Sequence, residues 1–173
     1  MPLFPIATPE LPEIVRLVNA AYRGDGAKAG WTHESDYLAG QRTDLAMLTE
    51  DLEEPGASIL GWRETGDGCL LGCVWLQPAE ADVWYLGMLT VRPDIQDGGL
   101  GRQILEAAER YAAEHGARRI TLTVVGVRDS LIAWYRRRGY APTGVREPFP
   151  YHDRRFGEPL REDLDFVRLE RAL

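Results

Sequence analysis

A glycine-rich segment between a strand-like and a helix-like stretch is the part of this sequence most suited to chemistry. It spans residues 86–102 and places Gly98, Gly99 and Gly101 directly before an amphipathic stretch. Glycines in such a loop let backbone N–H groups converge on an anion, and a helix N-terminus adds about half a positive charge. The segment therefore predicts a site for phosphate oxygens, which a pyrophosphate group would fit.

Two common phosphate-binding fingerprints do not match this loop. A dinucleotide fingerprint needs a third glycine three residues after Gly101, where the chain has Ile104. A P-loop needs Gly-Lys-Ser/Thr, and the sequence Gly101-Arg102-Gln103 lacks it. On glycine content alone, a plain tight turn is an equal alternative.

The spacing around the loop resembles the acyl-CoA-binding motif of the GNAT superfamily of N-acyltransferases. The matching residues are Val91-x-Pro93-x-x-Gln96-x-x-Gly99-x-Gly101. A second segment, residues 131–140, resembles the helix-to-strand piece that these enzymes commonly write as Leu-Tyr-x-x-x-Gly-Phe/Tyr. The resemblance implies an enzyme that transfers an acetyl group from acetyl-CoA to a primary amine of a small molecule or amino-acid-like acceptor.

The resemblance also implies which residues hold the acyl-CoA. They are Met88, Leu89, Thr90, Val91, Gln96, Asp97, Gly98, Gly99, Leu100, Gly101, Arg102, Arg128 and Tyr135. Two of them depart from the usual pattern. Asp97 puts a carboxylate beside the expected phosphate site, which weakens attraction unless it points outward. Arg128 stands where many members have Asn, and its guanidinium suits a phosphate and would offset Asp97.

The mechanism that the resemblance implies is direct attack of a neutral amine on the thioester. Backbone N–H groups of residues 88–91 are candidate oxyanion donors, provided that a bulge near Gly87 frees one from the sheet. Tyr135 matches the tyrosine that protonates the departing thiolate, because a phenol with a pKa of about 10 stays protonated at neutral pH. For the base that takes the proton of the amine, the sequence leaves Glu34 and Tyr85 open.

The acceptor pocket is expected near aromatic residues in irregular segments. The candidates are Trp31, Glu34, Tyr85 and Phe149. Each has a purely structural alternative, such as a first-turn carboxylate for Glu34 and a half-buried strand aromatic for Tyr85. Two other classes also stay open: a non-catalytic acyl-CoA-binding or regulatory module, and a nucleotide-binding protein that uses the same loop.

Hydrophobic periodicity predicts the elements that position these residues. Strands are expected at residues 3–8, 58–63, 69–76, 83–91, 119–125, 140–145 and 164–169, with turns at 66–68 and 78–82. Helices are expected at 9–22, 44–52 with Thr43 as the cap, 100–115 and 130–138, with a helical piece near 35–38. This order predicts an α/β (mixed α+β) fold with a GNAT-like, mostly antiparallel mixed sheet of about six to seven strands and about four helices.

Composition narrows the class further. With 173 residues, 45% of them hydrophobic and 27% charged, the chain is expected to form a single domain over residues 1–173. The net charge of −7 disfavours nucleic acid and is compatible with a cationic amine. Residues 136–138, three arginines, are interpreted as a solvated helix face. The histidines His33, His115 and His152 are isolated, so no metal site is predicted.

Cysteine usage and the N-terminus favour a cytoplasmic protein. Cys69 and Cys73 are four residues apart on an expected strand, about 13 Å, which is too far for a disulfide, and both are predicted to be packed thiols. Residues 1–5 show no signal-peptide pattern, and no apolar run is long enough to span a membrane. No membrane partner is expected, and a homodimer that pairs the last strand is left open.

Overall fold

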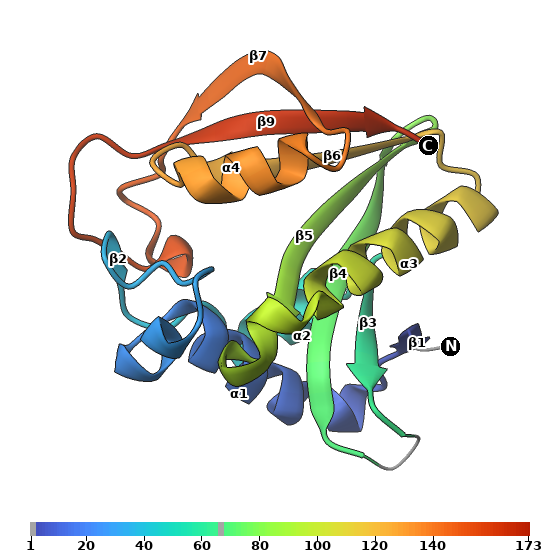
Figure 1. The fold of residues 1–173 in the computed structure, drawn as a ribbon, viewed down its shortest axis with the longest axis horizontal. Coiled ribbons are helices and arrows are strands. Elements are labelled where there is room, and N and C mark those ends of the chain that lie inside the picture. Colours follow the sequence, from blue (N-terminus) through green and yellow to red (C-terminus); the bar gives the residue numbers. More distant parts are fainter. Residues whose placement is uncertain (1–2, 66–67) are drawn as a thin grey trace.

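The computed structural model describes residues 3–65 and 68–173 (Figure 1). Strands within these residues are β1 (Leu3–Pro5), β3 (Ser58–Arg63), β4 (Leu70–Glu80), β5 (Val83–Val91), β6 (Arg119–Val125), β7 (Ala141–Pro148) and β9 (Asp165–Ala172). They form a seven-stranded sheet in the order β1-β3-β4-β5-β6-β9-β7. Every neighbouring pair is antiparallel except β5 and β6, which run parallel. The predicted mixed, mostly antiparallel fold is confirmed.

Four α-helices over the described residues cover the sheet. They are α1 (Leu11–Tyr22), α2 (Leu45–Asp51), α3 (Leu100–Glu114) and α4 (Asp129–Arg136). Figure 1 shows α3 crossing in front of β4 and β5, and α4 lying along β6 and β9. Successive residues of β4 point to opposite faces, so Val74 joins the core under α3 while Cys73 joins the core under α1. The sheet is therefore buried on both faces in its centre.

The centre of the sheet opens between its two parallel strands. β5 pairs with β6 only over Val83–Tyr85, and from Leu86 onward no pairing to β6 is formed within the described residues. On the other side of β5, the single residue of β4 between Cys73 and Trp75 lies opposite the two residues of β5 between Gly87 and Thr90. The extra residue makes a β-bulge with Met88 in the left-handed region, at φ 49°. The bulge that the oxyanion hypothesis requires near Gly87 is thus present.

A glycine is needed at position 87 because of a close approach. A Cβ atom there would lie 2.8 Å from Cε1 of Tyr85, closer than real Cβ contacts allow. The ring of Tyr85 therefore leans along β5 over the residue that precedes the bulge.

Several predicted boundaries were wrong at the start of the chain. β1 ends at Pro5, and a 3₁₀ turn (Thr8–Glu10) precedes α1. The helical piece expected near residues 35–38 is only a turn, in which the Glu34 carbonyl accepts the N–H groups of Tyr37 at 3.1 Å and Leu38 at 2.9 Å. Leu38 begins β2 (Leu38–Ala39), which pairs with β8 (Glu158–Pro159). Asp44, not Thr43, caps α2, because its carboxylate accepts the N–H of Met47 at 2.8 Å.

Other differences lie nearer the middle and the end of the chain. The hairpin of β4 and β5 turns tightly at Ala81, with φ 43°, so the expected turn over 78–82 is mostly strand. Cys69 is exposed, so only Cys73 is a packed thiol. Of the turn expected at 66–68, Gly66 and Asp67 lie outside the described residues. None of the helices over the described residues combines the length and apolar character that crossing a bilayer requires.

Candidate functional site

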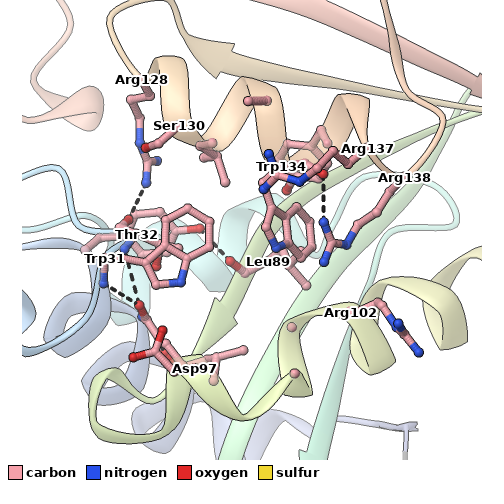
Figure 2. A pocket seen from close by; sticks show the side chains of 18 residues that line it. Trp31, Thr32, Leu89, Asp97, Arg102, Arg128, Ser130, Trp134, Arg137 and Arg138 are labelled. Atoms are coloured by element: carbon pink, nitrogen blue, oxygen red, sulfur yellow. Dashed lines mark hydrogen bonds between the residues drawn. The ribbon is translucent and has the colours of Figure 1, made fainter.

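Two cavities meet where the sheet opens. The first, of about 520 Å³, lies between α3 and α4 (Figure 2), and the second, of about 490 Å³, lies toward β6, β9 and the loop after β7. The residues that line both cavities are Tyr22, Leu89, Arg128, Leu131 and Tyr135. Two ligands, one in each cavity, would therefore meet at these shared residues.

The glycine loop forms one end of the first cavity. It is a 3₁₀ turn (Pro93–Gly98) followed by Gly99, which is the N-cap of α3 and has φ 77°. A Cβ atom at Gly98 or Gly99 would meet nothing within 4 Å, so the N-terminus of α3 is open to an approaching group. Asp97 also lines this end, with its side chain exposed to solvent. The loop thus keeps the geometry of an anion site, with a carboxylate at its rim.

Three arginines line the same cavity near the far end of α4. Figure 2 shows Arg137 and Arg138 on the α4 side and Arg102 on α3. Burial lowers the pKa of Arg138, and the charges of Arg137 and Arg102 lower it further. Within the described residues, its buried Nε atom has no hydrogen-bond partner. The three arginines therefore give this part of the cavity a positive charge, and the Nε of Arg138 is a donor without a partner among the described residues.

The interpretation of residues 136–138 as a solvated face was wrong for Arg138. Its guanidinium carbon lies 3.6 Å from the centre of the Trp134 ring, and its Nη1 donates to the Trp134 carbonyl at 2.8 Å. Because α4 ends at Arg136, Arg137 and Arg138 lie beyond the helix. Helical spacing therefore does not predict where their side chains lie.

Gln96 of the loop motif forms hydrogen bonds with residues 31–32, which are distant in sequence, and holds them at the first cavity. Its Oε1 accepts the N–H groups of Trp31 at 2.9 Å and Thr32 at 3.2 Å, and its Nε2 donates to the Val91 carbonyl at 3.1 Å. A Cβ atom at Gly30 would lie 2.3 Å from Oε1, so the approach needs a glycine. Gln96 thereby places the Trp31 ring 6.4 Å from the ring of Trp134 (Figure 2).

Replacing Gln96 with leucine is expected to raise the KM for the ligand of the first cavity about tenfold. The change removes three hydrogen bonds and releases the wall that Trp31 forms, since each bond contributes about 1 kcal/mol. Gln103→Leu, at an exposed position of α3, is the matched control and should leave KM unchanged. Steady-state kinetics of both variants test this role, and an equal KM for the two variants would contradict it.

Tyr135 is buried between the two cavities. It is 6% exposed, and its ring packs edge-on against Trp134 at 5.0 Å and Tyr140 at 5.5 Å. Burial raises the pKa of its hydroxyl above the ordinary value, so the phenol stays protonated at neutral pH. Across residues 3–65 and 68–173 the Tyr135 hydroxyl has no hydrogen-bond partner in the protein. It is thus a protonated donor at the junction of the cavities.

Tyr22 holds the bulged strand, a contact that sequence reasoning missed. As the last residue of α1, it donates its hydroxyl to the Leu89 carbonyl at 2.7 Å. Thr90 in turn donates its hydroxyl to the Met88 carbonyl at 2.9 Å. These bonds fix two carbonyls of residues 88–91 and so the orientation of the intervening peptides. No pattern in the sequence links the end of α1 to β5.

Glu34 and Arg128 form part of a buried ion network rather than two free groups. The Glu34 carboxylate accepts from Arg23 at 2.9 Å and from Arg128 at 3.2 Å. Burial would raise the pKa of Glu34, but the charges of Arg128, Arg23 and Arg42 outweigh it and hold the pKa below its ordinary value. Arg128 also donates to the Thr32 carbonyl. It therefore lies between the cavities, at the N-terminal end of α4, while the glycine loop begins α3 (Figure 2).

The remaining acceptor candidates divide between the cavities. Tyr85 and Phe149 line the second cavity, with the Tyr85 hydroxyl 3.3 Å from Oγ1 of Thr123. Trp31 lines the first cavity and is absent from the lining of the second. Over the described part of the chain, no group of three or more His, Cys, Asp or Glu side chains is placed to hold a metal ion.

A mixed sheet opens beside a glycine loop, and two cavities meet at the protonated Tyr135. The chain matches the Acetyltransferase (GNAT) family over residues 12–140, and it belongs to that family.

The relatives found by sequence match this chain over only part of their own length. An amino-acid acetyltransferase from Azotobacter vinelandii is 39% identical over 114 residues, which are 58% of this chain and 26% of that protein. A mycothiol acetyltransferase from Rhodococcus jostii is 27% identical over 134 residues, 75% of this chain and 41% of that protein. This chain therefore spans about a quarter to two fifths of these two relatives.

Solved structures share the fold, two of them over nearly the whole chain. An IAA acetyltransferase from Bacillus cereus superposes with a TM-score of 0.69 at 15% identity, covering 99% of this chain and 98% of its own. The ribosomal-protein-S18-alanine N-acetyltransferase from Escherichia coli gives 0.69 at 17%, covering 99% and 94%. A GNAT family acetyltransferase from Elizabethkingia anophelis with acetyl-CoA bound gives 0.63 at 17%, covering 74% and 82%.

Proposed function

We propose that the chain transfers an acetyl group from acetyl-CoA to the primary amine of a small, amino-acid-like molecule. The observation that carries the proposal is the pair of cavities that meet at the free, protonated hydroxyl of Tyr135. The family uses acetyl-CoA as its acetyl donor, and relatives by sequence include enzymes named amino-acid acetyltransferases.

The residues of the first cavity fit a long, anionic acetyl carrier. Backbone N–H groups at the start of α3, from Gly98 to Arg102, would hold phosphate oxygens. The free Nε donor of Arg138 and the neighbouring Arg137 supply positive charge at the same cavity. When bound there, acetyl-CoA supplies the thioester carbonyl that an amine attacks.

The protein's own groups would stabilise the charges that develop. Backbone N–H groups of residues 88–91, beside the bulge, are the proposed oxyanion donors, held in place by the Tyr22 hydroxyl. Tyr135 is the proposed acid that gives its proton to the departing sulfur. Its raised pKa keeps that proton available across the neutral range.

The proton of the amine needs an acceptor in the second cavity. Glu34 is a poor choice, because two arginines hold its carboxylate ionised and occupied. We therefore assign Glu34 the positioning of Arg128. Tyr85, whose hydroxyl forms a hydrogen bond with Thr123, is the proposed relay: its oxygen takes the proton of the amine while its own proton passes to water.

The alternative of a non-catalytic binding module is less well supported. Such a module does not need a tyrosine at the junction of two cavities whose hydroxyl, over residues 3–65 and 68–173, bonds to no protein group. A cytoplasmic location and a homodimer remain predictions from the sequence.

The proposed function is tested by release of the CoA thiol from acetyl-CoA in the presence of a panel of amino acids and simple amines. We expect thiol release to match the N-acetyl product measured by mass spectrometry, mole for mole. If acetyl-CoA binds while no amine is acetylated, the chain is a binding module and the proposal is wrong.

A further inference from the structure

The second cavity carries an excess of positive charge. Four arginines line it, Arg23, Arg42, Arg128 and Arg168, against two glutamates, Glu34 and Glu147. This local balance is opposite in sign to the net charge of −7 of the whole chain. A purely cationic acceptor would be repelled by this positive charge. The excess of arginines in the cavity therefore indicates that the acceptor also carries a negative group.

Three of these arginines are already bound within the protein, and one of them, Arg168, pairs with Glu147. Arg23 binds Glu34 and also donates to the carbonyls of Ala39 at 3.3 Å and Gln41 at 3.2 Å. Arg128 binds Glu34 and the Thr32 carbonyl. The guanidinium groups of Arg23 and Arg128 are therefore engaged within the protein. Glu34, which both of them bind, balances one of their two positive charges.

Arg42 is held in position by its backbone while its side chain stays free. The side-chain oxygen of Asn19 accepts the N–H groups of Arg42 at 2.6 Å and Thr43 at 3.0 Å, which fixes the peptide before α2. Within residues 3–65 and 68–173, the Arg42 guanidinium has no carboxylate or carbonyl partner. A half-buried, pre-positioned guanidinium with unused donors suits a carboxylate, which it can bind through two parallel hydrogen bonds.

Arg42 also lies beside the junction of the two cavities. Its guanidinium carbon is 5.6 Å from the centre of the Tyr22 ring, and Tyr22 lines both cavities. A carboxylate bound there would leave an amine on the adjoining carbon near the junction. Phe149 and Phe166 also line the second cavity, where their ring centres lie 5.5 Å apart and form an apolar wall. Arg168 lines the same cavity, and its buried Nε has no partner in the described residues.

We propose that Arg42 binds the carboxylate of the acceptor, and that the acceptor is a free α-amino acid with an apolar or aromatic side chain. The inference rests on the proposed acetyltransferase function and narrows its substrate class. Free amino acids satisfy three features of the second cavity together: an anion for Arg42, an amine near Tyr135 and an apolar side chain for the phenylalanine wall. Peptide N-termini lack a carboxylate at this position.

The test compares L-phenylalanine with L-phenylalanine amide as acceptors, at saturating acetyl-CoA. The amide has the less basic amine, so amine reactivity alone favours the amide. We expect the wild-type protein to prefer the free acid by at least about tenfold in kcat/KM, the range for loss of one charged hydrogen-bonded contact. Arg42→Gln should remove this preference, and Arg42→Lys should keep part of it, with KM for acetyl-CoA unchanged in both.

Arg110→Gln, at an exposed position of α3, is the matched control and should keep the full preference. Circular dichroism melting of each variant separates a folding defect from lost recognition. Equal use of acid and amide, use of neither while other amines are acetylated, or a preference that survives in folded Arg42→Gln would each overturn the inference and leave the proposed function intact. Acetylation of no amine at all would overturn the proposed function, and the inference with it.

Discussion

Replacing Tyr135 with phenylalanine is expected to lower kcat by about 10²–10⁴-fold while the Kd for acetyl-CoA changes less than about threefold. The substitution removes only the hydroxyl, which has no hydrogen bond to a described protein group and whose burial keeps it protonated. The aromatic packing against Trp134 and Tyr140 is kept. Thiol-release kinetics give kcat, and isothermal titration gives the Kd of the same preparation.

Tyr140→Phe is the matched control, because Tyr140 is the buried neighbour that faces away from the cavities. Its hydroxyl donates to Glu109 at 2.9 Å, and Glu109 also binds Arg171 at 2.9 Å. This variant should lose about 1–2 kcal/mol of unfolding free energy in urea, the value of a hydrogen bond to a charged group, and keep its kcat. A Tyr135→Phe protein with wild-type kcat would exclude Tyr135 as the acid.

Replacing Gly99 with aspartate is expected to weaken acetyl-CoA binding at least about 100-fold. Gly99 caps α3 with φ 77°, and open space surrounds the place where its Cβ would lie. A carboxylate there would occupy the proposed phosphate position and repel it at short range. Isothermal titration measures the loss.

Gly116→Asp provides the control at the opposite end of the same helix. Gly116 also has a left-handed backbone, with φ 96°, and open space around its Cβ position. Both variants therefore introduce comparable backbone strain of about 1 kcal/mol, but only the one at position 99 places a charge in the first cavity. Equal affinities in the two variants would contradict a phosphate site at the glycine loop.

Local patterns were sufficient to predict the regular part of the fold. The strands predicted at residues 58–63, 83–91 and 119–125 have the bounds that the structure shows, because β-branched and other apolar residues dominate or alternate in them. Gly116 and Gly139 follow the helices predicted at 100–115 and 130–138, and both adopt the positive φ that is common for a glycine after a helix. The pairing of β2 with β8 was missed, since two-residue strands carry no period and their partners lie far apart in the chain.

In the candidate site too, features carried by continuous motifs could be predicted, whereas contacts between residues far apart in sequence could not. The glycine loop and Tyr135 could be predicted because their motifs are continuous in sequence. The contacts that complete the site join distant residues, as when Tyr22 binds Leu89 or Gln96 binds the N–H of Trp31. Arg42 carries no motif at all, and only the tertiary structure places its guanidinium beside Tyr22.

The central claim, that the first cavity is an acetyl-CoA site, is tested most directly by isothermal titration of acetyl-CoA into the wild-type protein, with ATP and NAD titrated in parallel. We expect one acetyl-CoA to bind per chain with a Kd on the order of 1–100 µM, and the two nucleotides to bind much more weakly. No binding of acetyl-CoA, or equal binding of all three, would contradict it and leave the glycine loop as a turn or a general phosphate site.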